Sequence, residues 1–328
     1  MPGSDGKARA PDPVRYADVL AAADRIAGVA LNTPVLGCPA LDEQVGAPVR
    51  LKAESLQRAG AFKFRGACNA VRLLGADVTG VVTFSSGNHA AALALAARLA
   101  GRRAVLVMPD DTPQAKVEAV RRAEGEIVFY DRFSDDRDAI VASLQAERGL
   151  AFVPPFDDPA IIAGQGTVAL ELLADAPRVD TLLVPVSGGG LITGCAIAAR
   201  GMGRRVRIVG VEPHDADDFR RSLIAGERVA LPQSQSIADA LRISTPGRLT
   251  FALAREMVDE IVTVSDDDIR HAMRLLFECS KLVVEPSGTV GVAALLAGRV
   301  TAGEGEVGVI LSGGNVSVAQ FARLVDQT

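Results

Sequence analysis

Short apolar runs rich in β-branched residues alternate with helical segments along most of the chain. The first unit is a strand at residues 80–84, a polar turn at 85–89 and a helix at 90–100. The same order of strand, serine–glycine turn and helix recurs twice, with the strands at residues 181–186 and 307–311. Continuous apolar strands between helices indicate parallel sheets with helices on both faces. We therefore predict an α/β fold, and two such sheets fit the length of 328 residues.

The same patterns predict the remaining elements. Further strands are expected at residues 49–53, 103–109, 126–130 and 206–213. Further helices are expected at residues 16–27, 113–124, 134–148, 159–173, 265–280 and 316–324. In parallel α/β folds, ligands bind in loops at the carboxyl ends of the strands. The three serine–glycine turns follow strands in this way, so they are the first candidates for a ligand site.

Composition narrows the possible functions. The chain is 48% hydrophobic and 23% charged, as is ordinary for a globular protein. A formal net charge of -5 and the lack of any Lys/Arg-rich run argue against a nucleic-acid partner. The longest apolar run, residues 90–97, is too short to cross a bilayer, and residues 1–13 lack the apolar core of a signal peptide. Four scattered cysteines predict neither a zinc site nor a disulfide framework. We expect a soluble cytoplasmic protein without a membrane partner.

One lysine stands between two aromatic residues. Within residues 53–67, A-E-S-L-Q-R-A-G-A-F-K-F-R-G-A, Lys63 lies between Phe62 and Phe64. An amine among apolar rings is poorly solvated, which disfavours its charged form and lowers its pKa. Such a lysine can attack a carbonyl carbon and form a Schiff base. The alternative is a strand-edge lysine with its amine in water, because buried lysine is rare.

A glycine-rich turn at residues 187–190, S-G-G-G, follows a strand and opens a helix. Glycines let backbone N–H groups converge, and the helix N-terminus adds a partial positive charge, so the turn predicts an anion site. It lacks the patterns G-x-x-x-x-G-K-[ST] and G-x-G-x-x-G, which argues against a nucleoside triphosphate or a dinucleotide. A phosphate monoester fits better, and the alternative is a tight turn without a ligand.

Two other turns have polar side chains in the same position. Residues 85–89, S-S-G-N-H, offer hydroxyls, an amide and N–H groups that suit a carboxylate or a ring hydroxyl. Alternatively, this turn caps a helix at Asn88. Residues 312–315, S-G-G-N, place Ser312 at a strand end, where its hydroxyl can face a ligand heteroatom. As a lone serine, it is also a candidate helix cap.

Acidic residues cluster after the strand at 206–213. Glu212, Asp215, Asp217 and Asp218 lie within seven positions of one another. Carboxylates together with a backbone carbonyl on a short loop suit a hard cation such as Mg²⁺ or Ca²⁺. The alternative is a solvated acidic helix start that is stabilised by the helix dipole.

Taken together, the stretches Q-R-A-G-A-F-K-F-R-G-A, S-S-G-N-H, P-V-S-G-G-G-L, V-E-P-H-D-A-D-D and L-S-G-G-N-V resemble the fold-type II pyridoxal phosphate enzymes. The branch they resemble contains the threonine/serine dehydratases and serine racemases, and the likeness runs from about residue 17 to 325. It implies a two-domain, tryptophan synthase β-like fold. Residues 1–70 and 157–328 would form a large cofactor-binding domain, and residues 71–156 a small substrate-binding domain. It also implies a homodimer.

The resemblance implies a role for each motif residue. Lys63 would form the Schiff base with pyridoxal 5'-phosphate, Phe62 would lie against the cofactor ring, and Asn88 would hydrogen-bond the 3'-oxygen. Ser312 would meet the pyridine nitrogen, and a neutral serine there leaves the ring a weaker electron sink, which favours elimination. The phosphate would be held by Ser187, Gly188, Gly189, Gly190 and Leu191.

Substrate and metal residues follow from the same resemblance. The substrate carboxylate would be held by Ser85, Ser86, Gly87, Asn88 and His89. Arg137 lies where some relatives reach a second carboxylate, which keeps 3-hydroxyaspartate among the substrates, although a surface arginine is the simpler interpretation. Mg²⁺ or Ca²⁺ would be bound by Glu212, the carbonyl of Ala216, and Asp218.

The implied reaction is that of a dehydratase, or ammonia-lyase. It converts a β-hydroxy amino acid (threonine, serine or 3-hydroxyaspartate) to a 2-oxo acid and ammonia, with Lys63 removing the Cα proton. Racemisation is an alternative if Ser86 stands on the opposite face of Cα. The rival functions are a β-replacement enzyme of the cysteine synthase type and a non-catalytic binder. The stretches F-K-F-R-G and S-S-G-N-H argue against the first, and the presence of Lys63, Asn88, the glycine turn and Ser312 argues against the second. Ala61, Ala91 and the turn expected at residues 286–289 depart from the family pattern, and the first two of these departures bear on the identity of the substrate more than on the cofactor.

Overall fold

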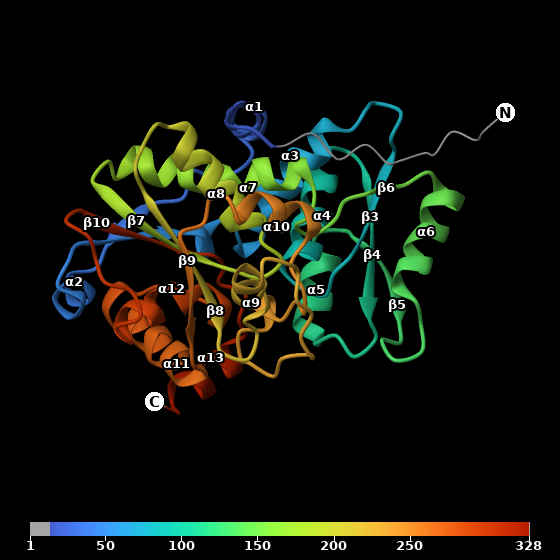
Figure 1. The fold of residues 1–328 in the computed structure, drawn as a ribbon. Coiled ribbons are helices and arrows are strands. Elements are labelled where there is room, and N and C mark those ends of the chain that lie inside the picture. Colours follow the sequence, from blue (N-terminus) through green and yellow to red (C-terminus); the bar gives the residue numbers. More distant parts are fainter. Residues whose placement is uncertain (1–13, 328) are drawn as a thin grey trace.

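Residues 14–327 are described by the computed structural model, and their strands form two separate sheets (Figure 1). The larger sheet has the strand order β1-β2-β10-β7-β8-β9. Its strands are β1 Val35–Gly37, β2 Val49–Ala53, β7 Val179–Pro185, β8 Arg207–Pro213, β9 Glu260–Val264 and β10 Glu306–Leu311. The smaller sheet has the order β5-β4-β3-β6. Its strands are β3 Gly80–Phe84, β4 Arg103–Pro109, β5 Glu126–Tyr130 and β6 Ala151–Phe152. Within this part of the chain, neighbouring strands pair in parallel except β1 with β2, so the predicted parallel sheets are confirmed.

Helices alternate with the strands as the apolar pattern predicts. The α-helices are α1 Tyr16–Ile26, α2 Pro39–Val45, α3 Lys63–Leu73, α4 Asn88–Leu99, α5 Gln114–Arg122, α6 Arg137–Arg148, α7 Pro159–Asp175, α8 Gly190–Gly201, α9 Asp218–Ala225, α10 Arg248–Ala254, α11 Asp266–Leu275, α12 Pro286–Leu296 and α13 Val318–Val325. Short 3₁₀-helices are η1 Glu54–Leu56, η2 Arg58–Gly60 and η3 Asp239–Leu241, and η4 Leu276–Ser280 is a π-helix. The helices α2, α9, α10 and α12 and the strand β9 were not predicted.

The predicted helices lie within about two residues of their observed limits, except for two that differ by more. The helix expected from residue 134 begins at Arg137, because the side chain of Asp136 accepts hydrogen bonds from the N–H groups of Asp138 (2.9 Å) and Ala139 (3.2 Å) and caps the helix there. The helix expected at residues 265–280 is α-helical only as far as Leu275 and then continues as the π-helix η4.

The prediction of a turn at residues 286–289 is wrong. These residues form the first turn of α12, with Pro286 at its first position. Proline is well placed there, because the first helical N–H has no partner within the helix and the ring already fixes a helical φ. Residues 1–13, expected to form a frayed tail, lie outside the described residues.

Helices cover both faces of each sheet. In the larger sheet, Leu182 packs in a cluster with α1, α7 and α8, whereas its neighbour Leu183 packs with α11 and α12. In the smaller sheet, Leu106 packs with α3, α4 and α5, whereas Val105 and Val107 pack with α6. Alternate strand residues point to opposite faces, so both faces of each sheet are buried.

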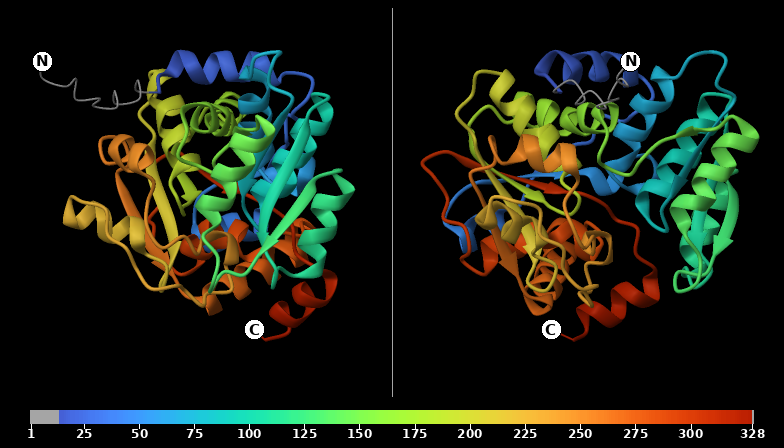
Figure 2. Two further views of the ribbon diagram at one scale, coloured as in Figure 1. Left: turned by 90° about the vertical axis from the view of Figure 1, so that its right-hand side faces the viewer. Right: turned by 45° about the vertical axis from the view of Figure 1, so that its right-hand side comes forward.

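The two sheets meet through side chains near the carboxyl ends of their strands. Lys116 on α5 forms an ion pair with Asp239 in η3 (2.5 Å), and Asn88 on α4 donates to Glu285 before α12 (2.6 Å). Figure 2 shows residues 80–152 alongside the rest of the chain. The division into a large and a small domain remains a prediction. Among the described residues, no helix combines the length and apolar character that crossing a membrane requires.

Candidate active site

Lys63 is the first residue of α3 and follows β2 through the short helices η1 and η2. Its Nζ donates to the carbonyl oxygen of Pro155 (2.7 Å) and lies 5.2 Å from the centre of the Phe62 ring. Burial of the amine lowers its pKa to about 8. With this pKa about a tenth of the amine is uncharged at pH 7, and the uncharged form is the one that acts as a nucleophile or a general base.

The segment that follows β6 forms one wall around this lysine. Pro155 accepts from Lys63, and the carbonyl of Val153 lies 3.1 Å from Nε2 of His89. A Cβ atom built on Gly188 would lie 2.4 Å from the ring of Phe156. Residues 153–156 therefore bring together the lysine, the turn before α4, and the glycine turn before α8.

The glycine turn at residues 187–190 joins β7 to α8, with Gly189 at a φ of 93°. Residues that carry a side chain rarely adopt this backbone conformation, and a Cβ on Gly189 would also lie 2.4 Å from Phe219. The carbonyl of Gly188 accepts from the N–H of Gly247 (3.3 Å) and the hydroxyl of Thr250 (2.6 Å). The hydroxyl of Ser187 is buried and has no partner among the described residues. With the free N–H groups of the α8 N-terminus, this hydroxyl suits a phosphate group.

The turn at residues 85–89 joins β3 to α4. Ser85, Ser86 and Gly87 are half-buried, and the hydroxyl of Ser85 accepts from the N–H of Gly87 (3.2 Å). His89 is buried, and burial, together with the charge of Lys63, lowers its pKa to about 3. Because the carbonyl of Val153 can only accept, Nε2 of the neutral ring carries the proton. Nδ1 is buried without a partner among the described residues, so it offers a lone pair to its surroundings.

The side-chain amide of Asn88 is held at both ends. Its Nδ2 donates to Oε1 of Glu285 (2.6 Å), and its Oδ1 accepts from Nδ2 of Asn315 (2.9 Å). These two contacts fix which end of the amide is the donor, and they leave one N–H of Nδ2 for another acceptor. Burial, with a contribution from the charge of Asp239, raises the pKa of Glu285 to about 8.

The turn after β10 contacts the lysine loop directly. The carbonyl of Ser312 accepts from the N–H of Phe62 (3.0 Å), and Ala61 and Gly313 pair as an isolated antiparallel bridge. Ser312 is 4% exposed. The structure thus brings Lys63, Phe62, Asn88, Ser312 and residues 187–190 into one connected set of loops.

The carboxylates predicted to bind a metal lie at the carboxyl end of β8. Glu212 accepts from the N–H groups of Phe219 (3.1 Å) and Arg220 (2.9 Å), so it caps α9. Both carboxylate oxygens of Asp218 are buried without a partner among the described residues. Burial raises the pKa of Glu212 well above its ordinary value, with a contribution from Asp218. Within residues 14–327, no group of three or more His, Cys, Asp or Glu side chains is arranged to hold a metal ion. Any cation would therefore also need backbone oxygens such as that of Ala216.

Arg137 is exposed at the start of α6, and its guanidinium lies 4.2 Å from the centre of the Phe84 ring. Phe84 is the last residue of β3 and directly precedes Ser85. A cation over an aromatic ring is attracted by the ring's electron density. This contact places Arg137 next to the turn predicted to bind the substrate carboxylate.

Sequence reasoning missed three residues that contact the predicted site. Glu285 comes to Asn88 from 197 positions away in the chain, and Pro155 and Phe156 contact the lysine and the glycine turn. A signal for Glu285 existed, because a residue that directly precedes a helix-starting proline is at a cap position. The signal for Pro155 and Phe156 was their position just after a parallel strand, where ligand loops lie.

Comparisons with known proteins agree on the kind of fold. The family model "Pyridoxal-phosphate dependent enzyme" matches residues 26–313. The L-threo-3-hydroxyaspartate ammonia-lyase of Saccharomyces cerevisiae is 44% identical over 312 residues, which cover 94% of this chain and 96% of that protein. The L-threonine ammonia-lyase of Geobacter sulfurreducens is 41% identical over 314 residues, which cover 95% of this chain and 78% of that protein. The structure of maize serine racemase superposes with a TM-score of 0.91 at 40% identity, covering 96% of this chain and 97% of that one. The resemblance drawn from the motifs is confirmed.

Proposed function

The chain belongs to the family of pyridoxal-phosphate dependent enzymes, and on that premise we propose that it is an ammonia-lyase acting on β-hydroxy amino acids, with a 3-hydroxyaspartate as its preferred substrate. The observation that carries the reaction is the desolvated amine of Lys63, which residues 153–156 connect to the glycine turn before α8. Water is eliminated from the substrate, and hydrolysis of the resulting enamine, through its imine, returns that water and yields a 2-oxo acid and ammonia.

The residues present fit the cofactor. The hydroxyl of Ser187, which is buried without a partner within residues 14–327, suits its phosphate, as do the N–H groups at the start of α8, where no described side chain caps the helix. The remaining N–H of Asn88 suits the 3'-oxygen, and Ser312 offers a neutral hydroxyl to the ring nitrogen. When bound, pyridoxal 5'-phosphate withdraws electrons from the substrate Cα and makes its proton acidic.

The residues of this chain supply the proton transfers and the orientation. We assign removal of the Cα proton to Lys63, because its lowered pKa leaves the amine able to accept a proton near neutral pH. The substrate α-carboxylate is assigned to the turn at residues 85–89 at the N-terminus of α4. Within that turn, the ring of His89 offers a lone pair at Nδ1, so the contribution of His89 to carboxylate binding comes from its backbone N–H.

The preference for a 3-hydroxyaspartate is supported by Arg137. Its guanidinium is a cation beside the turn that receives the α-carboxylate, and a second carboxylate on the substrate would match it. The name of the Saccharomyces cerevisiae relative agrees with this assignment. Threonine and serine lack a second carboxylate, so they would leave Arg137 without a partner in the site.

Racemisation is the second candidate function. It is supported by the similarity to maize serine racemase and by Ser86, which is half-buried in the turn assigned to the α-carboxylate. A serine hydroxyl on the face of Cα opposite Lys63 would return the proton from that side.

A divalent cation at Glu212, the carbonyl of Ala216, and Asp218 is also proposed. The support is the pair of buried carboxylate oxygens on Asp218, which have no partner among the residues that the structure describes and which only a donor or a cation can satisfy. We further propose that the protein is a cytoplasmic homodimer, and light scattering of the purified protein tests the oligomeric state.

The test is a substrate panel with the purified protein and pyridoxal 5'-phosphate. L-threo-3-hydroxyaspartate, L-threonine and L-serine are each supplied, and 2-oxo acid, ammonia and the opposite enantiomer are measured. The proposal expects 2-oxo acid and ammonia in equal amounts, fastest from hydroxyaspartate. Accumulation of D-serine without 2-oxo acid would instead support the racemase. Turnover that requires an added nucleophile would favour β-replacement and contradict both.

A further inference from the structure

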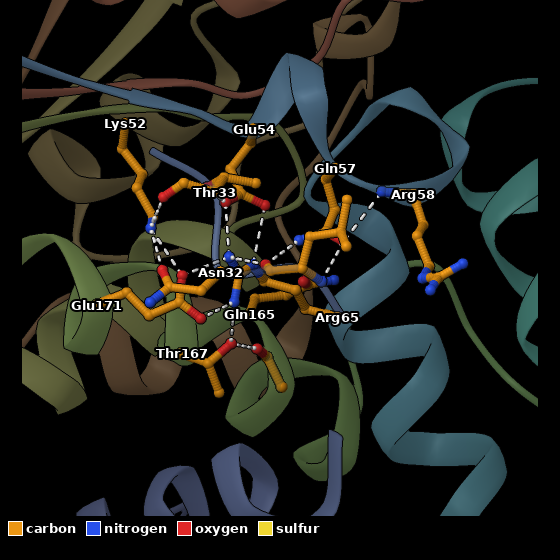
Figure 3. Close-up of polar contacts among 12 residues, drawn as sticks. Asn32, Thr33, Lys52, Glu54, Gln57, Arg58, Arg65, Gln165, Thr167 and Glu171 are labelled. Carbon is orange, nitrogen blue, oxygen red and sulfur yellow. Dashed lines mark hydrogen bonds and ion pairs between the residues drawn. The ribbon is translucent and has the colours of Figure 1, made fainter. Parts of the chain in front are cut away.

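A fully buried arginine lies two residues after Lys63. The side chains of Arg65 and Glu54 have no exposed surface. Nε of Arg65 donates to Oε2 of Glu54, and Nη2 to Oε1, both at 2.8 Å. The same guanidinium forms a second two-point contact with Glu171 of α7, from Nη1 to Oε1 (2.6 Å) and from Nη2 to Oε2 (2.7 Å). Figure 3 shows how these side chains converge from η1, α3 and α7.

Lys52 on β2 completes the charge balance. Its buried Nζ lies 2.7 Å from Oε2 of Glu171, 2.6 Å from the carbonyl oxygen of Thr33 and 3.3 Å from Oδ1 of Asn32. We call Lys52, Glu54, Arg65 and Glu171 the buried charge cluster. Two cations face two carboxylates in it, so its formal charge is zero, and each group has the partners that a buried charge requires.

The helix that carries Lys63 is packed backbone to backbone against α7. A Cβ built on Gly164 of α7 would lie 2.6 Å from Cα of Gly66, and the N–H of Gly66 donates to Oε1 of Gln165 (3.2 Å). One turn further along α7, Thr167 accepts from Nη1 of Arg65 (3.2 Å) and donates to the carbonyl of Gly164 (2.7 Å). The first turn of α3 therefore has one close-fitting position on α7.

The other side of α7 is packed in the same way against α8. A Cβ on Gly166 would lie 2.7 Å from the carbonyl oxygen of Gly194, and one on Gly194 would lie 2.6 Å from the N of Gly166. Helix α8 begins at Gly190, the last residue of the glycine turn. Helix α7 therefore lies between the helix that carries Lys63 and the helix that begins at the glycine turn, with a close glycine contact to each. These two contacts set the position of Lys63 relative to the turn.

We propose that Arg65 is a positioning residue for Lys63. Together with Glu54 and Glu171, it holds the first turn of α3 in one orientation against η1 and α7, so that the amine of Lys63 meets the cofactor held by the glycine turn before α8. This inference rests on the proposed function, because it takes Lys63 as the residue that bonds the cofactor.

Stability alone does not explain such a cluster. Replacing buried ion pairs by apolar side chains of similar volume is often neutral or stabilising. A planar guanidinium with two forked carboxylate contacts, in contrast, accepts only a narrow range of orientations. A misplacement of a catalytic group by about 1 Å can reduce a rate by about 100-fold. The cluster is therefore better explained by the orientation it imposes than by the stability it adds.

The test compares Arg65→Lys with Arg50→Lys. Arg50 lies on β2 and, like Arg65, forms a two-point contact with a carboxylate, that of Glu306 at the start of β10, but among the described residues it forms no hydrogen bond or ion pair with α3 or with the buried charge cluster. Lysine keeps the charge in each variant and removes the fork. Measurements are made below the melting temperature of every variant, with far-UV circular dichroism as the check of folding. They are the dissociation constant for pyridoxal 5'-phosphate, the rate at which the visible cofactor band forms in the apoprotein, kcat and KM.

For Arg65→Lys we expect a fall in kcat of about 10- to 100-fold with little change in KM, weaker cofactor binding, and slower band formation. We expect Arg50→Lys to change none of these. The inference would be overturned by an Arg65→Lys variant that has a lower melting temperature but keeps its cofactor affinity and kcat within about twofold of the parent.

If Arg65→Lys does not fold, a milder variant tests the positioning role of Arg65. Thr167→Val keeps the side-chain shape and removes one contact to Arg65, and we expect a drop in kcat of several-fold with the fold intact. A folded Thr167→Val with unchanged kcat and cofactor affinity would contradict the positioning role. Lys63→Ala separates the two claims. If it retains the cofactor band and turnover, the assignment of Lys63 in the proposed function fails, whereas its loss of both, with Arg65→Lys unchanged, rejects only the role of Arg65.

Discussion

Asn88 at the start of α4 donates to Glu285 at the start of α12 across 2.6 Å, which connects a helix of the smaller sheet to one of the larger sheet. Asn315 holds the other end of the same amide at 2.9 Å. The donor that Asn88 offers to a ligand is therefore oriented by residues from two distant parts of the chain.

Glu285 makes the stability of the cofactor-free protein depend on pH. Its pKa is raised from 4.5 to about 8 by burial, so the unfolded chain releases this proton at a lower pH than the folded protein does. Its contribution to stability is fully present below about pH 4.5 and is lost as the pH rises towards 8, by up to about 1.4 kcal/mol for each pH unit. Glu285→Gln keeps an acceptor for Asn88 and removes this dependence.

We expect denaturant titrations to show the free energy of unfolding of Glu285→Gln rising relative to the parent between these two pH values. Far-UV circular dichroism gives the midpoint and slope at each pH. Parallel curves for the two proteins across the range would show that Glu285 is ionised in the folded state.

Arg137 provides the test of substrate preference. Loss of one charge-assisted contact to a substrate costs about 1.5–3 kcal/mol, or about 10- to 150-fold in kcat/KM. We expect Arg137→Ala to lose this much with L-threo-3-hydroxyaspartate and little with L-serine. Arg148→Ala is the matched control, because Arg148 is an exposed arginine at the other end of α6, paired with Glu126. Equal losses on both substrates would mean that Arg137 does not read the second carboxylate.

The buried carboxylate of Asp218 leads us to expect that divalent metal ions change the melting temperature of the protein. Its two carboxylate oxygens lie buried near a second carboxylate, Glu212, and have no partner in the part of the chain that the structure describes, so a bound divalent cation should raise the melting temperature of the parent protein. In chelator, Asp218→Asn is expected to melt at least as high as the parent, because it removes an uncompensated buried charge. Adding Mg²⁺ or Ca²⁺ should then stabilise the parent alone. Differential scanning calorimetry measures this, and an equal response of both proteins would place the cation elsewhere.

The contact between α7 and α8 predicts a strong effect of one added methyl group. In Gly194→Ala, the new Cβ would lie 2.4 Å from the carbonyl oxygen of Ile162 and 2.6 Å from the N of Gly166, both of them backbone atoms that cannot turn aside. We expect a loss of about 1–3 kcal/mol or more in the free energy of unfolding. Gly37→Ala is the control, because its Cβ meets only the flexible guanidinium of Arg50, at 3.2 Å. Similar stabilities in a denaturant titration would show that the two helices can move apart at little cost.

The sequence predicted the parallel sheets and the loops that carry the candidate site, because both depend on local signals. Apolar runs mark the strands, and glycine with serine marks the turns that follow them. Glu285 was missed because the segment after it was interpreted as a turn rather than as the start of α12.

The buried charge cluster was beyond local signals altogether. Arg65 and Glu171 are 106 positions apart, and nothing in either neighbourhood shows that they meet. The carbonyl of Pro155, which holds the amine of Lys63, depends likewise on how β6 lies beside β3. Such contacts follow from the packing of whole elements, and only the three-dimensional structure provides them.

The most direct test of the account is Lys63→Ala, examined by absorbance after addition of pyridoxal 5'-phosphate and by 2-oxo acid release from L-threo-3-hydroxyaspartate. We expect a visible cofactor band and turnover in the parent protein, and neither in the variant, while circular dichroism shows the same fold. A variant that keeps both the band and the turnover would contradict the assignment of Lys63, and with it the proposed site.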